Sequence, residues 1–178
     1  MRVIAGEFGG RRLASPRAAG LRPTADRVRE ALFSILGGSV DDARVLDLYA
    51  GTGALALEAM SRGARSATCV ERSAGVLRAL ERNVRDLGLE RRVTIERGDA
   101  LAYARRLRGE SDRFDLVFCD PPYADELEPI LEDVVGGSWW TTAAVVEHVA
   151  TRSPATPAGL EADTRRYGDT GVTIYRRP

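Results

Sequence analysis

The chain has 178 residues, of which 44% are hydrophobic and 29% charged, and its 26 basic residues, all arginine, balance 26 acids. These values predict one folded domain and exclude a disordered chain, and the lack of a long apolar run or a signal-peptide core predicts a cytoplasmic protein without a membrane segment. Two cysteines and one histidine are too few for a disulfide framework or a four-ligand zinc site, so we expect no metal.

The first 38 residues are predicted to form a basic extension ahead of a domain that spans residues 39–178. Residues 1–30 carry seven arginines against three acids, although the whole chain is neutral. Their pattern predicts a small hairpin that turns at Gly9-Gly10, followed by a helix that Thr24 caps. Because guanidinium groups match the geometry of phosphate oxygens, the arginine excess favours contact with RNA or DNA.

Beyond this extension, short apolar runs alternate with segments of helical periodicity. The predicted strands are Arg44–Leu48, Ser66–Glu71, Arg92–Arg97, Phe114–Cys119, Ala143–Val149, Thr164–Tyr167 and Val172–Arg176. The predicted helices are Ala54–Arg62, Ala74–Leu87, a segment from Asp99 to Leu107, and Leu127–Val135. Strands that alternate with helices indicate a parallel sheet covered on both faces, and a hairpin through Gly168–Gly171 adds an antiparallel last strand. We therefore expect an α/β fold with a seven-stranded, mostly parallel sheet.

A glycine turn follows the first predicted strand. Gly51-Thr-Gly53 precedes a helix, and glycine there allows positive φ and close approach of a ligand to the backbone. With Ala56 the spacing matches the dinucleotide fingerprint. Glu71 lies 20 residues after Gly51, at the end of the second strand, where a carboxylate can accept both hydroxyl groups of a ribose. The pattern predicts a site for an adenosine-type nucleotide.

Two further acids indicate which nucleotide this is. Asp47 lies inside the strand before the glycine turn, where a dinucleotide fold usually has an apolar residue, and a carboxylate there suits a ligand with an ammonium group. Asp99, followed by Ala100 after the third strand, is placed to accept a hydrogen bond from an adenine amino group. These expected contacts describe S-adenosylmethionine better than NAD.

The sequence Asp120-Pro-Pro-Tyr123 ends the fourth strand and suggests the reaction. The proline pair forces the chain out of the sheet, and ligands of open α/β sheets bind at the strand carboxyl ends. The Asp120 carboxylate and the Pro121 carbonyl would accept the two hydrogens of an exocyclic amine and localise the nitrogen lone pair for attack on a methyl sulfonium. Tyr123 offers a ring on which a flipped base can stack. The benefit is positioning and electrostatics rather than covalent catalysis.

The motifs together resemble the RsmD family, a group of Rossmann-like, S-adenosylmethionine-dependent methyltransferases that modify the N2 amino group of a guanine in small-subunit (16S) ribosomal RNA. The resemblance extends over nearly the whole chain. It rests on Arg2–Gly6, Gly10–Leu13, Leu21–Thr24, Arg27–Phe33, Asp47–Gly53, Asp120–Tyr123 and Arg166–Thr170 followed by a strand that ends in Tyr175-Arg176. Acids within Glu161–Arg165, where basic side chains would be expected, depart from the family pattern.

The resemblance implies a role for each matched residue. It implies that Asp120, Pro121 and Tyr123 hold the target base, and that the N-terminal extension helps to hold the 16S rRNA or the small ribosomal subunit. The implied cofactor residues are Asp47, Gly51, Gly53, Glu71, Asp99 and Ala100, and the candidate RNA-binding residues are Arg11, Arg12 and Arg22. We expect a monomer with S-adenosylmethionine as its only cofactor.

Three alternatives stay open at this point. An adenine-N6 methyltransferase of DNA or RNA would use the same motifs, although 178 residues leave no room for the separate target-recognition domain that DNA enzymes of this type usually carry. An NAD-dependent oxidoreductase would share the glycine turn but would lack an obvious proton donor. A non-catalytic RNA-binding module would not require Asp120.

Overall fold

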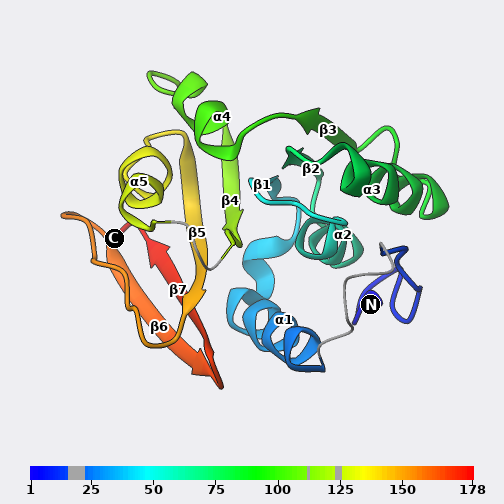
Figure 1. Cartoon of the computed structure of the whole chain (residues 1–178), viewed down its shortest axis with the longest axis horizontal. Coiled ribbons are helices and arrows are strands. Elements are labelled where there is room, and N and C mark those ends of the chain that lie inside the picture. The colour runs from blue at the N-terminus through cyan, green and yellow to red at the C-terminus, as the bar shows by residue number, and fades with distance from the viewer. Residues whose placement is uncertain (16–22, 112, 123–125) are drawn as a thin grey trace.

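The computed structural model of the chain describes residues 1–15, 23–111, 113–122 and 126–178, with the backbone alone described for residues 23–25. A seven-stranded sheet in the order β3-β2-β1-β4-β5-β7-β6 forms the centre of the molecule (Figure 1). The strands are β1 (Arg44–Asp47), β2 (Ser66–Glu71), β3 (Val93–Arg97), β4 (Phe114–Cys119), β5 (Trp140–Val149), β6 (Glu161–Tyr167) and β7 (Thr170–Arg176). Strands β1 to β5 pair in parallel, and β7 pairs antiparallel with both β5 and β6. The predicted sheet is confirmed.

Helices cover both faces of the sheet. They are α1 (Pro23–Leu36), a 3-10 turn η1 (Gly37–Val40), α2 (Ala54–Ser61), α3 (Ala74–Asp86), α4 (Ala100–Arg106), α5 (Glu128–Ile130) and its π-helical continuation η2 (Leu131–Val135). Successive residues of a strand point to opposite faces, so Val45 packs in the core under α1 to α3 whereas Leu46 packs in a second core under α4 and α5. The two groups of helices lie apart in Figure 1.

Several element boundaries differ from those predicted. Strand β5 begins at Trp140, three residues earlier than expected, because Trp140 pairs with Phe114 at the start of β4. The final hairpin turns over Gly168 and Asp169 alone, since Tyr167 and Thr170 still pair with each other. Helix α1 begins before Thr24, which therefore lies within the first turn rather than at the cap. The expected N-terminal hairpin is reduced to an isolated antiparallel bridge between Arg2 and Arg12.

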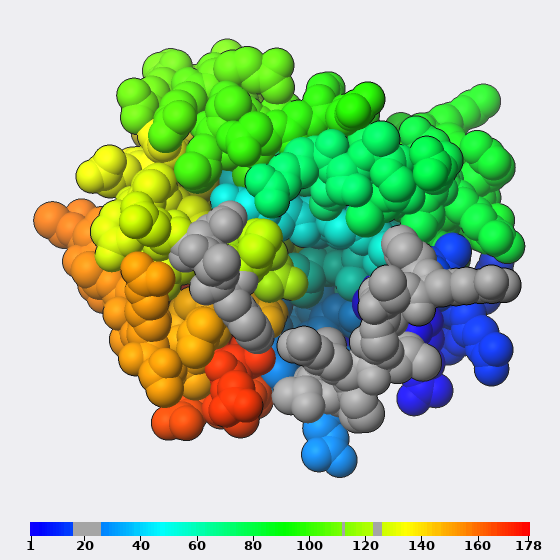
Figure 2. Space-filling model, viewed as in Figure 1, coloured from blue at the N-terminus to red at the C-terminus, as the bar shows by residue number. Residues whose placement is uncertain are grey.

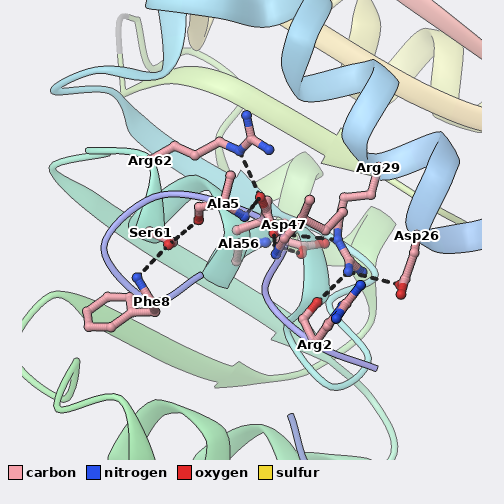
Figure 3. A network of polar contacts seen from close by, with 11 residues as sticks. Arg2, Ala5, Phe8, Asp26, Arg29, Asp47, Ala56, Ser61 and Arg62 are labelled. Atoms are coloured by element: carbon pink, nitrogen blue, oxygen red, sulfur yellow. Dashed lines mark hydrogen bonds and ion pairs between the residues drawn. The ribbon is translucent and has the colours of Figure 1, made fainter. Parts of the chain in front are cut away.

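A buried carboxylate fixes the N-terminal segment to α2. Glu58 is 0% exposed, and its two oxygens accept the backbone N–H groups of Ile4 (2.7 Å) and Ala5 (3.1 Å) and the Nε–H of Arg62 (2.7 Å). The guanidinium of Arg29 lies 3.7 Å from the same carboxylate (Figure 3). Three hydrogen bonds and a second guanidinium therefore offset the desolvation of one buried charge.

The N-terminal segment also contacts the last residue of α2. Ser61 Oγ donates to the Ala5 carbonyl at 2.5 Å and accepts the Phe8 N–H at 2.9 Å (Figure 3). Gly6 has φ +82°, and a Cβ at this position would lie 1.9 Å from the Ser61 carbonyl oxygen, so only glycine fits. Val3 also packs in the core shared by β1 and α2. Polar and apolar contacts together hold this segment against the sheet domain.

Candidate active site

A cavity of about 960 Å³ opens at the carboxyl ends of the parallel strands. The chain passes from β1 to β2 and β3 on one side and from β4 to β5 on the other, so strand order reverses between β1 and β4, where ligands of such sheets bind. The cavity wall includes Tyr49 after β1, Glu71 at the end of β2, Asp99 after β3 and Asp120 after β4. Figure 2 shows this face of the molecule hollowed between α3 and the segment that follows β4.

Five of the predicted site residues line this cavity. The lining residues are Glu71, Asp99, Ala100, Asp120 and Pro121. Asp47, Gly51 and Gly53 are not among the residues that line it. Tyr123 and Arg22 lie outside the described residues. The structure therefore brings together the residues at the ends of three strands, and the two glycines of the turn are not on the cavity wall.

Glu71 is held in place by backbone amides on both sides. Its Oε2 accepts the Gly51 N–H at 3.0 Å and its Oε1 accepts the Ser73 N–H at 2.7 Å. The amide of Gly51, expected to face a ligand, thus orients the carboxylate instead. Each carboxylate oxygen can accept a second hydrogen bond, so Glu71 keeps the capacity to bind two hydroxyl groups.

Asp99 and Ala100 form the N-terminus of α4. Asp99 is the N-cap, and its Oδ1 accepts the Ala102 N–H at 2.9 Å. The other carboxylate oxygen can accept from an amino group. Ala100 is the first residue of the helix, and an N–H at that position has no acceptor within its own helix, so it can donate to a ligand at the cavity wall. One donor and one acceptor side by side match the edge of an adenine.

Asp47 is the last residue of β1 and is not among the residues that line the cavity. It is 1% exposed, and its Oδ2 accepts the Ala56 N–H at 3.3 Å near the start of α2, while Oδ1 has no hydrogen-bond partner among the described residues. Burial raises the pKa of Asp47 to about 7, and the negative charges of Asp120 and Glu71 act in the same direction. Asp47 is therefore a buried acid with one oxygen that has no hydrogen-bond partner among the described residues.

The buried position of Asp47 leads to a prediction about the stability of the ligand-free protein. The pKa of Asp47 is raised above its ordinary value of 3.8 to about 7, so the folded state binds this proton more tightly than the unfolded chain does. The stability that the proton confers is complete below pH ~4 and is lost as the pH rises towards 7. Asp47→Asn should therefore raise the free energy of unfolding at pH 8 by on the order of 1 kcal/mol or more. Urea denaturation at pH 5 and pH 8 measures this, and an equal effect at both values would contradict it.

Glycine is needed at each of the two positions of the turn for a different structural reason. Gly53 has φ +88° and is the N-cap of α2, and a Cβ there would lie 2.5 Å from Leu80 Cδ1 of α3. It is therefore required for packing between α2 and α3. Gly51 has φ +54°, and around it a Cβ would meet only the Tyr49 carbonyl at 3.9 Å. Glycine is therefore required at position 51 by the positive φ and not by a lack of space for a side chain.

Asp120 is the carboxylate at the end of β4. Its side chain is exposed to the cavity. Partial loss of water around the carboxylate there raises its pKa above the ordinary value. Pro121 follows it directly and is buried, and its ring fixes the backbone φ at this position. The next strand contributes an acid that the sequence analysis did not single out, Glu147 of β5, which lies on the same cavity wall. The only signal for it is a charged residue within the apolar run Ala143–Val149.

Arg11 and Arg12 lie on the N-terminal segment, away from the residues that line the cavity. The Arg11 guanidinium donates to the Asp86 carbonyl at the end of α3 (2.7 Å), so this side chain joins the segment to the helix. Arg12 is exposed and pairs through its backbone with Arg2. A role of either side chain in RNA binding stays a prediction.

None of the helices in the described part of the chain has the length and apolar character of a membrane span.

Comparisons with known proteins agree with this geometry. Residues 1–176 match the family model described as "Conserved hypothetical protein 95". The Escherichia coli K12 protein named ribosomal RNA small subunit methyltransferase D is 34% identical over an alignment that covers 99% of this chain and 90% of that protein. A solved structure of a provisionally named methyltransferase from Escherichia coli superposes with a TM-score of 0.85 at 32% identity and covers 99% of this chain and 97% of its own.

A further solved structure extends the likeness to another organism. A hypothetical protein of Thermus thermophilus superposes with a TM-score of 0.83 at 28% identity, covering 100% of this chain and 99% of that one. Family model, sequence identity and fold agree over the full length of the chain. The chain therefore belongs to the RsmD family of methyltransferases.

Proposed function

We propose that this protein transfers a methyl group from S-adenosylmethionine to the exocyclic N2 of a guanine in small-subunit (16S) ribosomal RNA. The observation that carries the proposal is the position of Asp120 and Pro121, which lie on the wall of the same cavity as Glu71, Asp99 and Ala100. The acceptors that would hold the amine of the base therefore line the same cavity as the groups that would bind the nucleoside of the cofactor. The name of the Escherichia coli relative supports small-subunit ribosomal RNA as the substrate, and this substrate implies a cytoplasmic enzyme.

The hydrogen-bonding groups of the cavity fit S-adenosylmethionine. Glu71 can accept the ribose hydroxyl groups, and the Asp99 carboxylate and Ala100 N–H can hold the adenine edge. Asp47 has a buried oxygen without a partner among the described residues, which suits an ammonium group that enters from the cavity side. When bound, the sulfonium supplies an electrophilic methyl group. The acids around it provide the negative potential that a cationic ligand needs.

The residues at the end of β4 would act on the acceptor base. The lone pair of an aromatic amine is delocalised into the ring, which makes the nitrogen a weak nucleophile. The Asp120 carboxylate and the Pro121 carbonyl would each accept one N–H of the amine and hold the nitrogen with its lone pair directed at the methyl group. Fixed acceptors would also stabilise the positive charge that develops on the nitrogen as the N–C bond forms and the S–C bond breaks, and the Asp120 carboxylate could accept the proton that the methylated amine releases.

Methyl transfer to ribosomal subunits tests the function directly. Small subunits from a strain that lacks the corresponding methyltransferase are incubated with the protein and radiolabelled S-adenosylmethionine, and the labelled nucleoside is identified by mass spectrometry. We expect N2-methylguanosine. Label on N6 of adenosine, or no incorporation, would overturn the proposal.

Cofactor binding gives a separate prediction at Glu71. Because this carboxylate is the expected ribose contact, Glu71→Ala should weaken the binding of S-adenosylhomocysteine by ~10-fold or more, the usual effect of losing hydrogen bonds to a charged group. Isothermal titration calorimetry measures the affinity. Glu90→Gln, an exposed acid in the loop after α3, is the control that should bind as the wild type does. Unchanged affinity of Glu71→Ala would count against the ribose role.

A further inference from the structure

The acids of this protein fall into two groups that differ in their partners. Asp133 has a side chain only 3% exposed, and both Arg105 and Arg108 form ion pairs with it. Glu58 is fully buried and lies against Arg29 and Arg62. Burying a carboxylate costs free energy unless a cation or several donors neutralise it. These two structural acids of the core therefore each have arginine partners.

Glu147 belongs to the other group. It is half-buried on β5, lines the cavity, and forms no ion pair among the described residues. Burial raises its pKa well above the ordinary value, and the negative charge of Asp120 raises it further. Two carboxyl groups on one wall that have no cation beside them among the described residues add no stability to the fold, so their placement indicates a ligand that supplies donors.

The strand register explains why the two acids meet. Strands β4 and β5 are parallel neighbours, with Cys119 of β4 paired to Val146 of β5. Asp120 and Glu147 are the next residues along the chain, so both follow the same pair at the carboxyl edge of the sheet. Two acceptors side by side at this edge match a ligand with two adjacent donors.

Guanine presents two such donors on its Watson–Crick edge, the N2 amine and the neighbouring N1–H. Adenine has an acceptor at N1 instead. A base that is turned out of its stack is recognised by hydrogen bonds to this edge. We propose that Glu147 is a positioning residue that accepts the N1–H of the target guanine while Asp120 accepts from its N2 amine, an inference that rests on the function proposed above. A carboxyl group accepts this hydrogen bond whether it is ionised or protonated.

The test uses 2-aminopurine, which keeps the exocyclic amine of guanine but has no N1–H. Small subunits are reconstituted with RNA that carries either guanine or 2-aminopurine at the methylated nucleotide. The wild type should lose ~10-fold or more in kcat/KM on 2-aminopurine, because the half-buried acceptor is left without its donor. Glu147→Ala should lose a similar factor on guanine and should use the two bases within ~3-fold of each other.

Two further variants complete the experiment. Glu147→Gln keeps an acceptor oxygen and should retain the preference for guanine, whereas Glu90→Gln, which is not among the cavity residues, should match the wild type on both bases. Binding of S-adenosylhomocysteine checks that each variant is folded. Equal use of both bases by the wild type overturns the proposal without any variant, and so does a guanine preference that survives in Glu147→Ala. In both cases the enzyme still methylates guanine, so the result is distinct from a failure of the proposed function.

Discussion

Replacing Asp120 with alanine is expected to lower the rate of methyl transfer to small ribosomal subunits by ~100-fold or more, the usual cost of removing one acceptor or donor that acts in the transition state. The carboxylate lies at the cavity wall after β4, where it would accept an N–H of the target amine. Without it, the lone pair stays delocalised in the ring and the developing charge lacks its nearest stabilising group. Single-turnover incorporation of labelled methyl measures the rate.

The affinity for the cofactor separates this effect from a general loss of structure. Asp120 is not among the residues expected to hold S-adenosylmethionine, so Asp120→Ala should bind S-adenosylhomocysteine nearly as the wild type does. Asp120→Asn retains one acceptor oxygen of the same size and should lose less activity than the alanine variant. If Asp120→Ala transfers methyl groups at the wild-type rate, the carboxylate has no part in the reaction.

The second large effect concerns stability at Glu58. Glu58→Ala leaves the backbone amides of Ile4 and Ala5 without their acceptor and the guanidinium of Arg29 without its buried partner. Breaking a buried ion pair from one side typically costs ~3–5 kcal/mol. For a chain of this length, such a loss corresponds to a melting temperature lower by ~10 °C or more. Thermal unfolding followed by circular dichroism measures it.

An exposed ion pair provides the matched control. Asp42 and Arg65 pair at the surface, with side chains 67% and 62% exposed. Removing this pair by Arg65→Ala should lower the melting temperature much less than Glu58→Ala does, because solvent screens such interactions. If Glu58→Ala and Arg65→Ala lower the melting temperature equally, the buried network does not hold the N-terminal segment in the way described.

The order of strands and helices could be read from the sequence because each element carries its own pattern. Apolar runs such as Phe114–Cys119 favour buried strands when they alternate with helices, and the parallel sheet follows from that alternation. Residues at the ends of these strands, Glu71, Asp99 and Asp120, could be assigned to a common site for the same reason. Position at the edge of a parallel sheet is thus encoded locally.

Other features depend on contacts that no local pattern shows. Glu147 reaches the site only because β5 lies next to β4, and in the sequence it stands alone in an apolar run. Glu58 reads as an ordinary acid within an otherwise apolar helix, yet the two backbone amides that donate to it are 53 and 54 residues away in the chain. The hydrogen bond that one oxygen of Asp47 accepts from the Ala56 N–H near the start of α2 likewise has no signal in the sequence.

The attachment of the N-terminal segment to α2 has a consequence for synthesis of the chain. Residues 1–8 are synthesised before the groups that hold them, Glu58 and Ser61, which are added more than fifty residues later. During synthesis this segment therefore remains without its final partners until the helix that anchors it has emerged from the exit tunnel. Its contacts form only after the first strand and helix of the sheet region exist.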